Sequence, residues 1–281
     1  MPAFERQSAM RLFSKRSWSA RLVGHPGRFC YAGTMSQSSL CMFIHPIYGA
    51  ILSTSRHAWG EVMPSIFDII GPITVGPSSS HTAGAIRIGQ IARLLLGGEV
   101  RRADITLYGS FAETGKGHGT DRAIVGGLLG LDMASPEIPE SFQEARRRGL
   151  AYSLHAAEES RYHSNTVVVE AFGVNNSVRI RASSVGGGNI RLDAMNDYEL
   201  GIACDQPTLV LPHNDHPGVV AAVTTALSQQ GFNIAAMKVA RARRGGDAVA
   251  MIETDTEVPK ETREIIAAIP GITDVIYIPK I

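Results

Sequence analysis

The chain of 281 residues is 44% hydrophobic and 19% charged, which is typical of a soluble globular protein long enough for two ordinary domains. Its formal net charge of +1 argues against a large nucleic-acid-binding surface. Its three cysteines, Cys30, Cys41 and Cys204, have no short paired spacing, which argues against a disulfide framework or a cysteine-built metal site and favours a reducing, cytoplasmic compartment.

Residues 1–62 differ in composition from the rest of the chain. They are basic and rich in serine, with few acidic residues and no sustained helical or strand periodicity. Such a start is typical of an organellar transit peptide, but we expect a disordered or untranslated extension, with the folded protein beginning near Met63. The apolar run at 42–52 is interrupted and too short to span a bilayer, so no membrane association is expected.

The most unusual stretch is residues 76–84, Gly-Pro-Ser-Ser-Ser-His-Thr-Ala-Gly. Serine and threonine are favoured N-caps, and an apolar helical pattern follows as far as Gly97, so a helix is expected to start here. The free amides and positive dipole at a helix start suit a carboxylate or phosphate, and an imidazole adds proton exchange near neutral pH. The alternative is a capping turn with a solvated histidine. The residues concerned are Ser78, Ser79, Ser80, His81 and Thr82.

A second polar, glycine-rich stretch occupies residues 115–122, after a half-buried strand expected at 103–108. Its three glycines surround His118 and would let a loop approach a ligand closely, and Asp121 or the threonine before it is expected to cap the next helix. The stretch lacks the Gly-Lys-Ser/Thr of a Walker phosphate loop. A flexible surface loop is the alternative interpretation.

The rest of the middle region predicts one polar helix and several strands, two of them joined by a Gly-Val-Asn-Asn hairpin turn. His155 and His163 lie in a polar connector and match no standard metal-ligand spacing, so we interpret them as surface residues. The region is therefore expected to be α+β with mainly antiparallel strands. The predicted elements are a helix at 140–151 and strands at 166–172, 177–182 and around 190–192.

The C-terminal region has a clearer pattern of strand, helix, two strands joined by a glycine-rich turn, helix and strand. This βαββαβ order predicts a ferredoxin-like sandwich, with two helices on one face of a four-stranded sheet. The elements are expected at 208–211, 215–230, 233–241, 248–253, 259–268 and 275–278.

The βαββαβ order, with Asn214-Asp215-His216-Pro217-Gly218 at the first strand–helix turn, resembles an ACT domain. Domains of that family often pair and bind small amino acids at this turn. The resemblance therefore implies effector binding by Asn214, Asp215 and Gly218, and further oligomerisation of the chain through this unit.

The stretches Ser65–Pro72, Gly76–Gly84 and Gly117–Asp121 resemble the β subunit of iron–sulfur-dependent L-serine dehydratase, also called L-serine ammonia-lyase. The resemblance runs from Met63 to Ile281 and implies an α+β serine dehydratase β domain at 63–205 followed by an ACT domain at 206–281. In that family a separate α subunit or a fused α domain supplies the cysteines of a [4Fe–4S] cluster. Because Cys204 is the sole cysteine after Met63, the resemblance implies a separate α partner and no metal ligand in this chain.

The resemblance also implies a reaction, the conversion of L-serine to pyruvate and ammonia in amino-acid degradation and gluconeogenesis. Removal of the α proton needs a base, for which His81 is the candidate, and His118 is the second catalytic candidate. The implied substrate-binding residues are Ser78, Ser79, Ser80, Thr82 and Asp121.

A different function is implied by a second resemblance. Middle domains of this kind are similar to effector-binding domains appended to phosphoglycerate dehydrogenases, so the chain could be a non-catalytic serine-binding regulatory module. The two histidines favour the enzyme, because a sensor needs no base.

Overall fold

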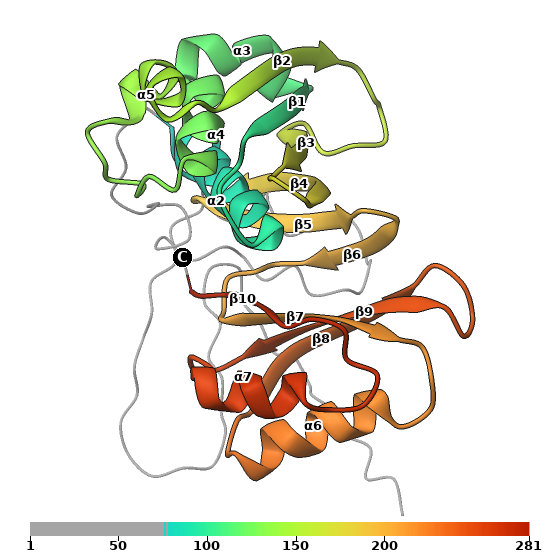
Figure 1. The fold of residues 1–281 in the computed structure, drawn as a ribbon. Coiled ribbons are helices and arrows are strands. Elements are labelled where there is room, and N and C mark those ends of the chain that lie inside the picture. Colours follow the sequence, from blue (N-terminus) through green and yellow to red (C-terminus); the bar gives the residue numbers. More distant parts are fainter. Residues whose placement is uncertain (1–75, 77, 281) are drawn as a thin grey trace, which may run out of the picture. The chain divides into compact units, whose positions relative to one another are not determined.

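The computed structural model describes residue 76 and residues 78–280, so the extension predicted at 1–62 lies outside the described residues. The described part contains a six-stranded sheet and a four-stranded sheet, each accompanied by helices (Figure 1). The α+β class expected from the sequence is confirmed, with the part built on the six-stranded sheet preceding the ferredoxin-like part.

The first part places short helices between the strands of a sheet with the order β2-β1-β3-β4-β5-β6. Strands β1 and β2 are parallel, and the remaining neighbours are antiparallel. Along β1 the burial alternates: Ala103, Ile105 and Leu107 are buried, whereas Asp104 and Thr106 are partly exposed. One face of the sheet therefore packs on the core. The elements are the π-helical turn η2 (Ser79–Ala83), α2 (Gly84–Leu96), β1 (Arg102–Tyr108), α3 (Ser110–His118), α4 (Thr120–Leu128), the 3₁₀ turn η3 (Ile138–Glu140), α5 (Ser141–Arg148), β2 (Ala151–Ala157), β3 (Thr166–Phe172), β4 (Ser177–Gly186), β5 (Asn189–Met195) and β6 (Tyr198–Ile202).

Helix α2 is the central helix of this part. Its apolar side chains recur at helical spacing, and Ile86, Ile88 and Ile91 are fully buried. It ends where predicted, because Gly97 adopts φ 75° and donates its amide to the carbonyl of Leu94 at 3.0 Å.

Helices α2 and α4 cross with almost no space between their backbones. A Cβ atom added to Gly127 would lie 2.1 Å from the carbonyl oxygen of Ile86, and one added to Gly89 would lie 2.4 Å from that of Ile124. Only hydrogen fits at these two positions, so the glycines set the separation of the two helices.

Two sequence expectations about this part are wrong. The glycine-rich stretch 115–122 is helical apart from a break at Gly119, whose φ of 70° ends α3 and begins α4. Neither Thr120 nor Asp121 caps α4 with its side chain, because Gly119 occupies the cap position. Strands β2 and β6 were not expected; both lie at sheet edges, where polar side chains weaken the alternating apolar pattern.

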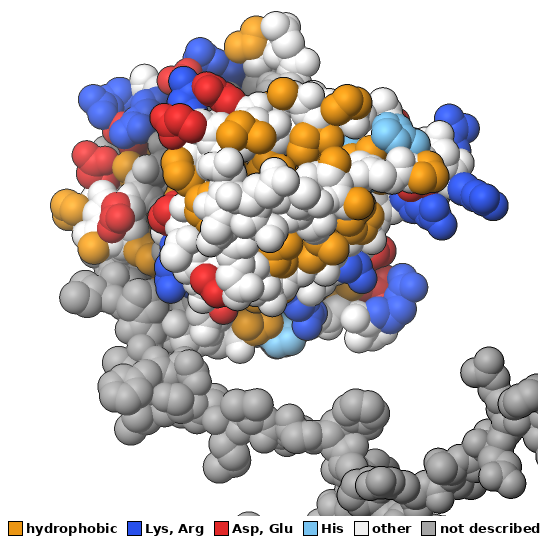
Figure 2. All heavy atoms as spheres, turned by 90° about the horizontal axis from the view of Figure 1, so that it is seen from below, with side chains coloured by type: hydrophobic (Ala, Val, Ile, Leu, Met, Phe, Trp, Pro, Cys, Tyr) orange, Lys and Arg blue, Asp and Glu red, His pale blue; other side chains and the backbone are white. Residues whose placement is uncertain are grey.

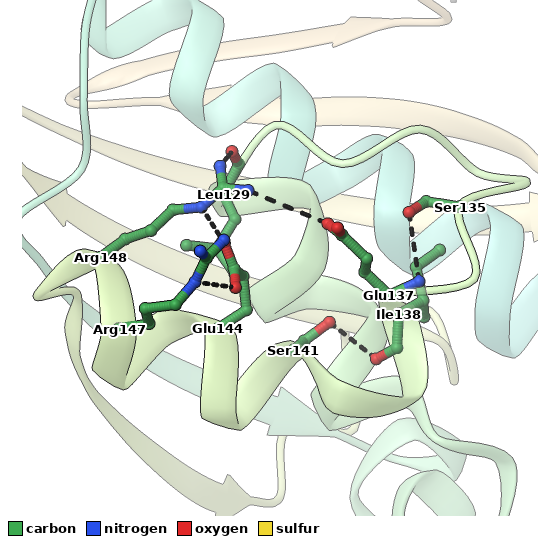
Figure 3. Close-up of polar contacts among 8 residues, drawn as sticks. All are labelled: Leu129, Ser135, Glu137, Ile138, Ser141, Glu144, Arg147 and Arg148. Atoms are coloured by element: carbon green, nitrogen blue, oxygen red, sulfur yellow. Dashed lines mark hydrogen bonds and ion pairs between the residues drawn. The ribbon is translucent and has the colours of Figure 1, made fainter.

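The arginine-rich end of α5 carries a defined ion-pair group (Figure 3). Arg147 donates to both carboxylate oxygens of Glu144 at 2.7 Å, and Arg148 pairs with the same carboxylate. These hydrogen bonds hold the pKa of Glu144 at about 2. Arg148 also donates to the carbonyl of Leu129 at 3.2 Å, which links α5 to the end of α4.

The second part confirms the ferredoxin-like βαββαβ prediction. Its sheet has the order β10-β7-β9-β8, and all neighbouring strands are antiparallel. Its core is a separate apolar cluster that includes Leu209, Leu211, Leu227 and Ile252. Helix α6 starts later than expected, after Gly218, so Pro217 precedes the helix. The elements are β7 (Thr208–Asn214), α6 (Val219–Gln229), β8 (Ile234–Arg241), β9 (Asp247–Thr254), α7 (Lys260–Ala267) and β10 (Ile276–Ile278).

Within the described residues, no helix combines the length and the apolar character that crossing a bilayer requires.

Replacing Gly127 with alanine is expected to destabilise the protein by about 2–3 kcal/mol, because the new methyl group collides with the α2 backbone. Urea unfolding followed by circular dichroism measures this change in the free energy of unfolding. Gly98→Ala is the matched control: no atom lies within 4 Å of its added Cβ, so its effect should stay within about 0.5 kcal/mol. Equal effects of the two substitutions would contradict the close crossing.

Candidate active site

The predicted serine–histidine stretch starts a helix, as expected, but through a π-helical turn. Ser78 is the N-cap, and its hydroxyl accepts the amide of His81 at 3.2 Å. The amide of Gly84 bonds back to the carbonyl of Ser79, which widens the turn before α2 begins. Single π turns occur frequently at functional sites, because they displace side chains from the regular helical register.

Hydroxyl groups contact both ring nitrogens of His81. The Nδ1 atom lies 3.2 Å from Oγ of Ser80 and 3.4 Å from Oγ of Ser78. The Nε2 atom lies 3.0 Å from Oγ of Ser110, the first residue of α3. The ring of Phe111, also on α3, packs in a T-shaped arrangement with the imidazole at a centroid distance of 5.3 Å. The imidazole is therefore held in place by three serines and one aromatic ring.

His118 lies beside His81, with ring centroids 4.8 Å apart. Its Nδ1 donates to the carbonyl oxygen of Thr114 at 3.1 Å, because a carbonyl can only accept. Its Nε2 is therefore the lone-pair nitrogen in the neutral ring. The hydroxyl of Thr82, which is buried, donates to the carbonyl of His118 at 3.3 Å and links the two histidine segments.

The position of Ser110 depends on the glycine before it. Gly109 adopts φ 52° and ψ −128°, a conformation that is strongly disfavoured for residues with a side chain. A Cβ atom at this position would lie 2.6 Å from the carbonyl oxygen of Ser164. The same carbonyl oxygen accepts a hydrogen bond from the amide of Phe111. The tight turn after β1 thus places the hydroxyl of Ser110 next to the imidazole of His81.

The electrostatic environment keeps His81 neutral. Partial burial lowers the pKa of His81 below its usual 6.5, and the neighbouring His118 lowers it further, while a hydrogen bond to the Ser110 backbone raises it. At pH 7 the imidazole can therefore accept a proton.

The structure brings together most of the residues predicted for this site. Ser78, Ser80, Thr82 and His118 all contact His81 or its neighbouring segment, and Ser79 begins the π turn. Asp121 lies in the first turn of α4, where its carboxylate accepts the amide of Arg122.

Sequence reasoning missed two residues of α3, Ser110 and Thr114. The available signal was a glycine–serine pair directly after a predicted strand, a position at which loops often carry functional side chains.

The described residues do not fit an iron–sulfur cluster held by this chain alone. No group of three or more His, Cys, Asp or Glu side chains converges as metal ligands in the described part of the chain. Cys204 is 1% exposed, and burial raises the pKa of its thiol far above the usual range, so it is not poised as a thiolate ligand.

In the predicted effector-binding turn, the carboxylate of Asp215 already forms hydrogen bonds within the chain. Asp215 accepts hydrogen bonds from Arg241 at 3.0 Å and from the amide of Gly245 at 2.9 Å, so it anchors the β8–β9 hairpin. Asn214 is exposed, and Gly218 has φ 100° before α6. The effector role of these three residues stays a prediction.

Comparisons with known proteins agree with this architecture. The family model described as serine dehydratase beta chain matches residues 65–150, and the ACT domain model matches residues 210–271. The probable L-serine dehydratase, beta chain, of Bacillus subtilis (strain 168) is 39% identical over 75% of this chain and 96% of its own length. The L-serine dehydratase, beta chain, of Peptoniphilus asaccharolyticus is 32% identical over 76% and 97%.

A more distant relative has a different name. The D-3-phosphoglycerate dehydrogenase of Methanocaldococcus jannaschii is 28% identical over 68% of this chain but only 36% of its own length. Since the two beta chains match over nearly their whole length, the chain belongs to the L-serine dehydratase beta chain family, with a C-terminal ACT domain.

The His81–His118 contact predicts how one imidazole titrates. Replacing His118 with glutamine is expected to raise the pKa of His81 toward 6.5, because the substitution removes a like charge that opposes protonation of His81. An NMR titration of the His81 ring measures this shift, and His155→Gln, at an exposed site on β2, is the control that should leave it unchanged. A lower or unchanged pKa of His81 in the His118 variant would contradict the coupling.

Proposed function

We propose that this chain is the β subunit of a [4Fe–4S]-dependent L-serine ammonia-lyase, which converts L-serine to pyruvate and ammonia together with a cysteine-bearing α subunit. The observation that carries the proposal is the neutral imidazole of His81, surrounded by hydroxyls at a helix start and adjacent to a second imidazole. The names of the two beta-chain relatives support both the substrate and the partner. We assign the reaction to amino-acid degradation and gluconeogenesis in the cytoplasm.

The chemistry requires removal of the α proton of L-serine and loss of its β-hydroxyl as water. The resulting aminoacrylate tautomerises to an imine, and water hydrolyses the imine to pyruvate and ammonia. A cluster ligated by the α subunit would supply a Lewis acid for the departing hydroxyl. This chain would supply the base, His81, and the second imidazole, His118, next to it.

Substrate binding is proposed for the start of η2. The positive end of a helix dipole favours a carboxylate, and the hydroxyls of Ser78 and Ser80, with Ser79 between them, provide hydrogen bonds. Thr82 acts by connecting this turn to the His118 carbonyl. Asp121, at the start of α4, is retained as a candidate for orienting the substrate.

The proposal predicts that the purified chain alone is inactive and that activity appears with the α subunit and an anaerobically rebuilt cluster. In that complex, His81→Ala should lower kcat at least about 100-fold, whereas KM for L-serine changes far less, because the base acts in the transition state. Pyruvate release from L-serine is the measurement. Near-normal turnover of the variant complex would remove the assignment of His81 as the base.

The second candidate is a serine-binding regulatory module without catalysis. The similarity to a D-3-phosphoglycerate dehydrogenase, in a segment that makes up about a third of that enzyme, favours this alternative. Calorimetry with L-serine and a pull-down for a cysteine-rich partner discriminate the two: tight binding of serine without any partner supports the module.

We also propose that the ACT domain adds an oligomer contact. Strand β8 ends the order of its sheet, so one side of its backbone is unpaired among the described residues. Its Met237 and Val239 side chains are 43% and 41% exposed, which is unusual for large hydrophobic residues. Figure 2, seen from the side of α6 and α7, shows hydrophobic side chains scattered over this face and charged ones mostly toward its margin.

The ACT contact is tested by placing a charge on the exposed edge strand. Val239→Lys is expected to dissociate the self-associated chain into smaller species, because a desolvated ammonium disfavours edge pairing. Sedimentation velocity measures the change. Val174→Lys is the matched control, since Val174 is 78% exposed in the turn between β3 and β4. A wild-type chain that is monomeric at all concentrations would refute the contact.

A further inference from the structure

We infer that the hydroxyls of Ser110 and Thr114 on α3 hold His81 in its Nε2–H tautomer, so that Nδ1 is the atom that accepts the substrate proton. The inference rests on the proposed function for the role of His81, but the tautomer itself is a property of this chain. Ser110 and Thr114 are positioning residues, because they act through the imidazole.

The distances indicate which atom donates at each hydrogen bond from Thr114 through Ser110 to His81. Thr114 donates its hydroxyl hydrogen to the carbonyl oxygen of Ser110 at 2.9 Å, because that carbonyl can only accept. The lone pairs of the Thr114 hydroxyl then face Oγ of Ser110 at 3.5 Å. When Ser110 donates toward Thr114, its own lone pairs face Nε2 of His81 at 3.0 Å, which places the hydrogen on Nε2.

The opposite ring nitrogen of His81 has different partners. With Nε2 protonated, Nδ1 carries the lone pair and faces the hydroxyls of Ser80 and Ser78, both of which can donate. This is the side of the ring at which the helix start offers hydrogen bonds to a carboxylate. The base therefore lies on the same side of the ring as the proposed substrate-binding groups.

In His118 the hydrogen and the lone pair are on the opposite ring nitrogens from those in His81. His118 donates from Nδ1 to the carbonyl of Thr114, so its lone pair is on Nε2. Among the described residues, His118 is the titratable group that acts on the charge of His81, while Phe111 of α3 contributes an apolar ring. One helix thus fixes the tautomers of both histidines, through Ser110 and through the Thr114 carbonyl.

Long-range ¹H–¹⁵N correlation spectra of the full chain, labelled with ¹⁵N-histidine, test the inference directly. The wild-type spectrum should show protonated Nε2 at His81 and protonated Nδ1 at His118. Ser110→Ala should increase the Nδ1–H population of His81, because a proton on Nε2 loses its hydroxyl acceptor. Ser110→Thr, which keeps the hydroxyl, should restore the wild-type pattern.

Thr114→Val is the second variant, at an exposed position of α3 where folding is not at risk. It removes the acceptor for the Ser110 hydroxyl, so Ser110 can donate to Nε2 and the Nδ1–H tautomer of His81 should appear. Ser153→Ala is the matched control, because Ser153 contacts Nε2 of His155 at 3.1 Å on β2 and should alter that ring alone.

In the complex with the α subunit, Ser110→Ala should lower kcat about tenfold, with KM for L-serine within about twofold. A wild-type His81 with hydrogen on Nδ1, or an unchanged tautomer in both variants, would overturn the inference. A complex that releases no pyruvate while His81 shows Nε2–H would refute the proposed function and leave the tautomer assignment standing.

Discussion

The site depends on how closely α2 and α4 approach each other. Gly89 and Gly127 lie at the crossing, where each backbone meets the other without a side chain between them. His81 precedes α2 and His118 precedes α4 by similar numbers of residues, so the crossing also controls how near the two imidazoles come. A wider crossing would separate the rings, even with every residue of the site unchanged. The absence of side chains at Gly89 and Gly127 therefore determines both the packing of the two helices and the distance between the two imidazoles.

The proposed chemistry uses uncharged hydroxyls and the neutral imidazole of His81. Partial burial disfavours protonation of His81, and the neighbouring ring of His118 acts in the same direction. The surrounding groups are hydroxyls and backbone atoms, which orient the rings without adding charge. This arrangement maintains a base at neutral pH and leaves the positive helix start free to attract an anion.

Much of the fold could be predicted from the sequence, because its signals are local. Helix α2 has an apolar spacing and a terminal glycine, and an N-cap serine begins the π turn that leads into it. The βαββαβ order of the C-terminal part follows from alternating strand and helix patterns. Strand β2 was missed because it is a polar edge strand whose parallel pairing with β1 is a tertiary contact. The glycine-rich stretch was misread because Gly115, which is buried, and Gly117 both lie within α3 despite the low helix propensity of glycine, and Gly119 alone breaks the helix.

The candidate site was predictable only in part. Two dense polar motifs contain Ser78, Ser80, His81 and His118. Residue type alone was therefore enough to predict these four as site residues. Ser110 has no such motif, and its contact with His81 spans 29 residues and depends on the tight turn at Gly109. No local sequence pattern predicts the contact between Ser110 and His81.

The burial of Cys204 has a practical consequence. A thiol that is kept protonated and away from solvent reacts slowly with dioxygen and peroxides, since the thiolate is the reactive form. Within the described part of the chain, sulfur oxidation at a cysteine is thus an improbable route to damage. The side chain of Cys204 can therefore withstand aerobic handling of the folded chain.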